Sequence, residues 1–68
     1  LAANAVRVSP GLIWFGTDAG AYVWDGTAMV VLTAPLPSVI VQQIAVDGAS
    51  GAVWLATPSG LVRVEGRP

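Results

Sequence analysis

The sequence predicts an all-β fold made of two copies of one antiparallel meander, the second of which lacks its outermost strand. Three observations carry this prediction. Short apolar runs rich in Val, Ile, Trp and Tyr are bounded by Gly, Pro, Asp and Ser, as strands are bounded by turns. No stretch places apolar residues at helical spacing between capping residues. A motif also recurs after 40 residues.

The repeat consists of identical residues that stand 40 positions apart and read Gly-x-φ-Trp-φ-small-Thr-x-x-Gly, where φ is apolar. The identical pairs are Gly11/Gly51, Trp14/Trp54, Thr17/Thr57, Gly20/Gly60 and Gly26/Gly66. The loop before the second copy is two residues longer, an insertion that turns absorb at little cost. We therefore expect two equivalent units, over about 4–33 and about 39–66, within one domain fragment that covers 1–68.

The strands of these units follow in order along the chain. They are predicted at 4–8, 12–16, 21–24 and 28–32 in the first unit, and at 40–46, 52–56 and 61–64 in the second. The run 12–15 is apolar on both faces, whereas a half-exposed antiparallel strand alternates with polar residues. Four-stranded units of about 40 residues that stack face to face are the blades of a β-propeller. The expected fold is thus a β-propeller fragment of about two blades.

The turns between the strands have signatures of their own. Thr57-Pro58-Ser59-Gly60 places Pro second and Gly fourth, as type I turns prefer, and 17–20 is the same turn in the first unit. Ser9-Pro10-Gly11 suits a type II turn with Gly at positive φ, and Asp25-Gly26 is typical of a two-residue hairpin. The turns 17–20 and 57–60 should share one end of the sheets, and 9–11 and 25–26 the other.

Composition excludes several function classes. The 68 residues are 54% hydrophobic and 10% charged, which is too apolar for a disordered chain. A net charge of −1 leaves no basic patch for nucleic acid. The absence of Cys and His removes disulfides, most metal sites and the Ser-His triad. We expect no catalytic residue, no cofactor and no metal. The apolar stretch 28–46 is interrupted by Pro35 and Pro37, so we expect no membrane insertion.

The repeated residues are interpreted as structural, because they recur at the same points of the unit. Trp14 and Trp54 are expected to be wedged between blades rather than to stack on a ligand, so Trp54→Ala should destabilise the fold. The hydroxyls of Thr17 and Thr57 are expected to cap the following turns. The same structural set includes Gly11, Gly20, Gly51 and Gly60.

Two residues at the turn tips are the candidate site residues. Asp18 and Ser59 lie where the units differ, between a Thr and a Gly that do not differ. Loops at one end of a propeller usually carry binding, so we expect these two side chains to face a ligand or partner.

The repeat resembles the two-component regulator propeller repeat. The residues that carry the resemblance are Leu36-Pro37-Ser38, then Ile44 and Asp47, then Gly51-Ala52-Val53-Trp54-Leu55-Ala56-Thr57, Gly60-Leu61 and Arg63, and 11–20 matches the centre of the same pattern. The resemblance implies a non-catalytic segment of the sensor region of a bacterial histidine kinase or hybrid regulator. It further implies a periplasmic or extracellular location and the sensing of a carbohydrate-type ligand.

Two other functions stay open. The chain is also compatible with a fragment of a propeller enzyme similar to streptogramin lyases, whose site His would come from other blades. It is equally compatible with a structural propeller that assembles from copies. Because the sequence begins at Leu1 in mid-pattern, we expect a segment of a longer protein. Fewer than two complete units leave apolar blade faces open, so the expected partners are neighbouring blades of the same parent chain or of other copies.

Overall fold

The strands form two antiparallel sheets, each in chain order. The computed structural model describes residues 2–33 and 36–65, and within these ranges it contains no helix. The first sheet consists of β1 (Ala5–Ser9), β2 (Leu12–Thr17), β3 (Gly20–Trp24) and β4 (Met29–Leu32). The second sheet consists of β5 (Gln43–Val46), β6 (Ala52–Thr57) and β7 (Gly60–Glu65). The predicted all-β fold of one four-stranded and one three-stranded meander is confirmed; Gly66, which belongs to the repeat, lies outside the described residues.

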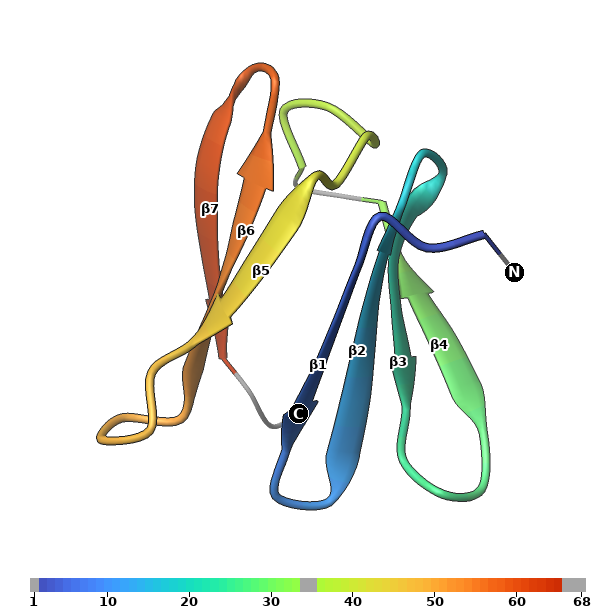
Figure 1. The fold of residues 1–68 in the computed structure, drawn as a ribbon, viewed down its shortest axis with the longest axis vertical. Coiled ribbons are helices and arrows are strands. Elements are labelled where there is room, and N and C mark those ends of the chain that lie inside the picture. The colour runs from blue at the N-terminus through green and yellow to red at the C-terminus, as the bar shows by residue number, and fades with distance from the viewer. Residues whose placement is uncertain (1, 34–35, 66–68) are drawn as a thin grey trace.

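The two sheets stand side by side, with β1 of the first sheet next to β5 of the second (Figure 1). The β2–β3 and β6–β7 turns lie at one end of the sheets, at the top of the picture. The β1–β2, β3–β4 and β5–β6 turns lie at the other end. The sheets therefore share the same orientation, as successive blades of a propeller do, and the turns are grouped by end as the repeat predicts.

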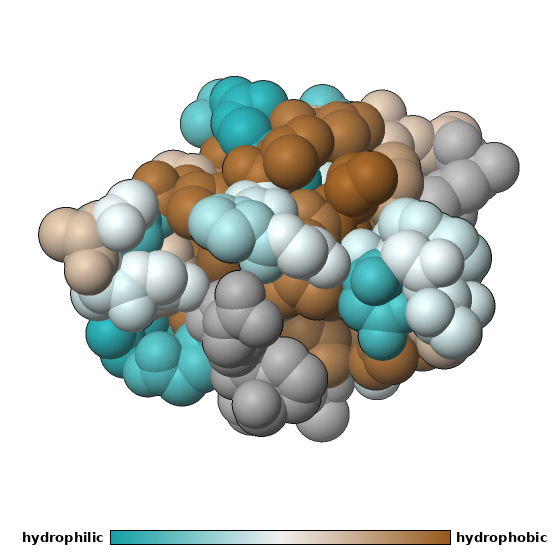
Figure 2. All heavy atoms as spheres, turned by 90° about the horizontal axis from the view of Figure 1, so that it is seen from below, coloured by the Kyte–Doolittle hydropathy of each residue, from teal (hydrophilic) through white to brown (hydrophobic). Residues whose placement is uncertain are grey.

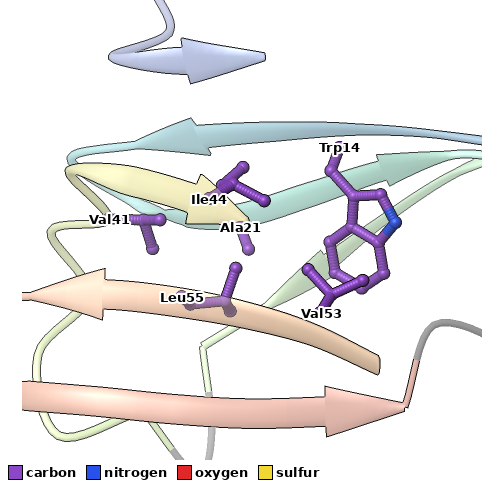
Figure 3. Packing of buried hydrophobic residues seen from close by; sticks show 6 residues of the cluster. All are labelled: Trp14, Ala21, Val41, Ile44, Val53 and Leu55. Carbon is purple, nitrogen blue, oxygen red and sulfur yellow. The ribbon is translucent and has the colours of Figure 1, made fainter. Parts of the chain in front are cut away.

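The core lies between the sheets. Side chains alternate between the two faces of a strand, so each sheet has one face toward the other sheet and one outward face. Trp14 and Ala21 of the first sheet point toward Val53 and Leu55 of the second (Figure 3), and all four are at most 2% exposed. Because both inner faces are apolar, stacking them removes hydrocarbon from water, which is the main source of stability in such a small chain.

The segment before β5 crosses to the first sheet. The strand predicted at 40–46 begins only at Gln43, because the Val41 N–H donates to the carbonyl of Thr17 at 2.8 Å. The Val41 side chain is fully buried against Gly16. A Cβ on Gly16 would lie 2.7 Å from Val41 Cγ1, closer than real atoms approach, so only glycine leaves room for this valine.

One sequence prediction about the turns at this end of the sheets is confirmed, and another is wrong. Gly11 has a φ of 79°, the positive value expected in the turn after Pro10. In contrast, the prediction of a two-residue hairpin at Asp25-Gly26 is wrong, since Trp24 pairs with Met29 across a four-residue loop. Asp25 explains the longer loop, because its Oδ1 accepts the backbone N–H groups of residues 27 and 28 at 2.8 Å each.

The threonine hydroxyls close the equivalent turns of both units. Thr17 Oγ1 donates to the carbonyl of Gly20 at 2.8 Å and accepts the Ala19 N–H at 3.0 Å. Thr57 Oγ1 donates to the carbonyl of Gly60 at 2.9 Å and accepts the Ser59 N–H at 3.2 Å. This is the capping geometry that the repeat predicts, and it satisfies backbone groups that the turn would otherwise leave unpaired.

Candidate functional site

The predicted site residues lie at the tips of equivalent turns, and both are exposed. Asp18 Oδ1 accepts a hydrogen bond from Asn4 Nδ2 at 2.9 Å, and the same amide donates to the carbonyl of Val41 at 3.1 Å. Asp18 therefore helps to position Asn4, which in turn contacts the segment that precedes β5. Neither Asp18 nor Ser59 lines the clefts described below, and their role in binding stays a prediction.

A polar cleft lies at the opposite end, between the β1–β2 and β5–β6 turns, and we call it the turn cleft. It has a volume of about 340 Å³. Its polar side chains are Ser9, Asp47, Ser50 and Glu65, and Pro10, Val46, Gly48 and Gly51 complete the wall. Figure 2 shows the molecule from this end, where hydrophilic residues (teal) are scattered around exposed apolar ones (brown).

Asp47 organises the second-sheet wall of the turn cleft. Its Oδ2 accepts a hydrogen bond from Ser50 Oγ at 2.9 Å, and its Oδ1 accepts the Ala49 N–H at 3.0 Å. The Asp47 carbonyl accepts the Gly51 N–H at 2.8 Å, which closes the turn. The Ser50 hydroxyl and then the Ala49 N–H hold the pKa of Asp47 below its ordinary value of 3.8. The cleft therefore presents a preorganised carboxylate at neutral pH.

The other polar walls of the turn cleft come from Ser9 and Glu65. Ser9 Oγ is buried and has no hydrogen-bond partner among the described residues. Glu65 pairs with Arg63 at 3.0 Å, and both side chains of this pair are largely exposed. An exposed ion pair contributes little to stability, so the Glu65 carboxylate remains available as an acceptor.

An apolar cleft of about 220 Å³ opens beside the core of the first sheet. Its apolar walls are Leu12, Trp14, Val23, Ala28, Val30 and Leu32, and Asp25 and Glu65 contribute carboxylates. Trp14 Nε1 is buried and finds no acceptor among residues 2–33 and 36–65. An indole N–H can only donate, and leaving it unpaired in the interior costs free energy.

The two repeated tryptophans have different surroundings. Trp14 is 2% exposed, but Trp54 is 39% exposed. Within the chain, Trp14 therefore lies between the two sheets and Trp54 does not, and the expectation that Trp54 is wedged against a further blade stays a prediction. Equivalent residues point in the same direction, so Trp14 points from the first sheet into the second, and Trp54 points from the second sheet away from the first. Its expected role in stability changes accordingly.

Sequence reasoning missed the turn cleft, because its walls come from both units. Ser9 lies at the end of β1, whereas Asp47, Ser50 and Glu65 belong to the second sheet. Only the packing of the sheets brings them together. The one signal available was the Asp47-to-Gly51 loop, whose composition is typical of a side-chain-closed turn. The described part of the chain contains no group of three His, Cys, Asp or Glu residues that could hold a metal ion.

The acid sensitivity of folding should reflect the aspartate loops. Backbone N–H groups, that of Ala28 foremost, hold the pKa of Asp25 below 3.8, and Asp47 is lowered as described above. Because the folded pKa lies below the unfolded one, this stabilisation is present above about pH 4 and is lost as the pH falls through the folded pKa. We expect Asp25→Asn/Asp47→Asn to show a smaller drop in Tm between about pH 4 and 2 than the wild type.

Asp18→Asn, which lies outside both loops, controls for the loss of a carboxylate. Thermal unfolding followed by circular dichroism measures the Tm. Equal acid slopes in the wild type and the double variant would contradict the assignment of these loops as acid-sensitive.

Comparison with known proteins provides no relative for this chain. No family model matches it, and no curated protein and no solved structure is significantly similar to it. Within residues 2–33 and 36–65, no helix is long and apolar enough to cross a membrane.

Proposed function

We propose that the chain is a non-catalytic, ligand-sensing segment of a sensor-type β-propeller, as its resemblance to the two-component regulator propeller repeat implies. In this proposal it lies in the periplasm or outside the cell, packs against neighbouring blades, and neither binds nucleic acid nor enters the membrane. The observation that carries the proposal is the turn cleft, which forms where two blades meet and has hydrogen-bonding groups from both.

The chemistry of the turn cleft favours a carbohydrate-type ligand. Sugar hydroxyls donate well to carboxylates, and Asp47 and Glu65 both offer carboxylate oxygens there. Ser9 adds a hydroxyl without a partner among the described residues, and Pro10 and Val46 add apolar contact. A volume of about 340 Å³ is at the lower end of the range of small-ligand sites, which suits a mono- or disaccharide.

A nuclear magnetic resonance titration with neutral mono- and disaccharides tests the proposal. We expect amide shifts at Ser9, Asp47 and Ser50, and we expect Glu65→Gln to weaken binding by about tenfold, because a hydrogen bond to a charged acceptor contributes roughly 1.5–3 kcal/mol. Asp18→Asn, at the far end of the sheets, is the matched control. Shifts confined to Asp18 and Ser59 would move the site to the turn tips, and no saturable shift with any sugar would overturn the carbohydrate proposal.

A further inference from the structure

The outward face of the first sheet repeats the inner face of the second. Cross-strand register places its apolar residues on one side, and the repeat pairs each of them with a residue of the second sheet that packs toward Trp14. The equivalent pairs are Val6/Ile44, Val8/Val46, Ile13/Val53, Phe15/Leu55, Tyr22/Val62 and Trp24/Val64. Every pair is apolar, yet Val6 and Val8 are 46% and 74% exposed.

The outward face of the second sheet correspondingly repeats the inner face of the first. Trp54 stands where Trp14 stands, and its cross-strand partner is Arg63. Trp54 and Leu61 are 39% and 69% exposed. Within the chain, the inner face of the first sheet packs on the inner face of the second, and these two faces differ. The two outward faces repeat the same pair of faces, but both are exposed. Exposed apolar side chains that gather on one face of a protein, as Val6 and Val8 do on one sheet and Trp54 and Leu61 on the other, mark interaction sites.

The residues that would contact each other across the two open faces are complementary in size. Inside the chain, Gly16 makes room for Val41 across the sheets. The residue equivalent to Gly16 is Ala56, which pairs with Gln43 as Gly16 pairs with Ala5. Val41 lies two residues before Gln43, so its equivalent is the residue two before Ala5. This residue is Ala3, which is exposed. Ala56 has one methyl group more than its equivalent Gly16, and Ala3 has two carbons fewer than its equivalent Val41. The larger residue on one open face is therefore matched by a smaller residue on the other.

The same equivalence identifies a backbone hydrogen bond. Within the chain, the Val41 N–H donates to the carbonyl of Thr17 and ties the two sheets together. The equivalent groups on the open faces are the N–H of Ala3 and the carbonyl of Thr57. Both belong to segments with the same local geometry, since the Asn4 N–H donates to the carbonyl of Gly16 at 2.6 Å and the Gln42 N–H to that of Ala56 at 2.8 Å.

We propose that copies of this chain associate head to tail, with the outward face of one copy's second sheet on the outward face of the next copy's first sheet. The inference rests on the proposed role of the blade faces and names their partner as a second copy. It continues the blade-on-blade interface already present in the chain, with Ala56 against Ala3 in place of Gly16 against Val41. Because the faces differ, the contact is heterologous and closes only as a ring. Two to four copies would supply four to eight blades, the roughly 4–8 of closed propellers.

Blocking one face at a time tests the head-to-tail arrangement. Val8→Lys places a charge on the outward face of the first sheet, and Leu61→Lys places one on that of the second. Both side chains are largely exposed, so neither change should disturb the fold of one copy. In analytical ultracentrifugation, we expect the wild type to form closed species of two to four copies and each variant alone to sediment as a monomer. An equimolar mixture of the two variants should form a dimer and nothing larger, because one intact interface remains.

Other outcomes of this experiment overturn the proposal. A monomeric wild type would mean that other blades of a longer chain cover these faces. A variant that dimerises by itself would indicate an isologous contact, such as pairing between the β7 strands of two copies. Sugar binding by a monomeric wild type would leave the proposed function intact, whereas head-to-tail assembly without sugar binding would retain the inference about the faces.

Disulfide trapping tests the register. The chain has no Cys, so Ala3→Cys and Ala56→Cys chains introduce the only thiols. Inside the chain, a Cβ built on Gly16 lies 3.3 Å from Val41 Cβ, close to the separation that a disulfide spans. We expect an oxidised mixture of the two variants to form linked dimers, and either variant alone, or Ala3→Cys mixed with Ala49→Cys, to form far fewer. Equal linking in all mixtures would refute the register.

Discussion

Replacing Trp14 by alanine is expected to lower the free energy of unfolding by about 3–5 kcal/mol, whereas the same change at Trp54 should cost much less in a single copy. The two indoles occupy equivalent positions in the repeat, but Trp14 is 2% and Trp54 39% exposed. Truncating the buried ring leaves a cavity between Val53 and Ala21, and truncating the other removes contacts that water already partly replaces.

The comparison is made with urea unfolding of chains that also contain Val8→Lys, so that every variant remains a single copy. Trp14→Phe keeps a ring in the core and serves as the milder variant if Trp14→Ala does not fold. Coinciding midpoints for Trp14→Ala and Trp54→Ala would contradict the burial difference. Without the Val8→Lys background, Trp54→Ala should weaken association, since the proposed assembly buries this indole.

Gly20→Ala is expected to be much more destabilising than Gly60→Ala, although the two glycines are repeat equivalents. Gly20 has a φ of 115° and Gly60 a φ of 136°, so a side chain at either position is strained by about 1–3 kcal/mol. At Gly20 a Cβ would also lie 2.6 Å from the carbonyl oxygen of Leu32, whereas nothing lies within 4 Å of a Cβ at Gly60. That backbone contact adds an overpacking cost of about 1–3 kcal/mol.

The same urea titration measures the difference, with Gly60→Ala as the matched control for the φ strain. The contrast arises because β4 pairs with β3 beside Gly20, whereas β7, the equivalent of β3, is the last described strand of the second sheet. Equal losses in the two variants would show that β4 does not hold its carbonyl against Gly20 in solution.

Local patterns were sufficient for the features that depend on neighbouring residues. Val- and Ile-rich runs between Gly and Pro determined the strands to within a few residues. The repeated Thr and Gly determined the closed turns, because a hydroxyl reaches only its own turn. The four-residue loop at Asp25 was not predicted, because an Asp-Gly pair favours a two-residue hairpin. The longer loop depends on the Asp25 carboxylate, which accepts the N–H groups of residues 27 and 28.

The sequence by itself determined the two equivalent units, their strand order and the strand that is apolar on both faces, because these follow from spacing along the chain. Only the tertiary structure decided which equivalent residues differ in environment. Trp14 and Trp54, and Gly16 and Ala56, have similar local sequences, but one member of each pair faces the other sheet and one faces outward. The turn cleft likewise needs Ser9 and Asp47 from different units. Burial depends on what stands opposite a side chain, and the local sequence of a repeat does not specify this.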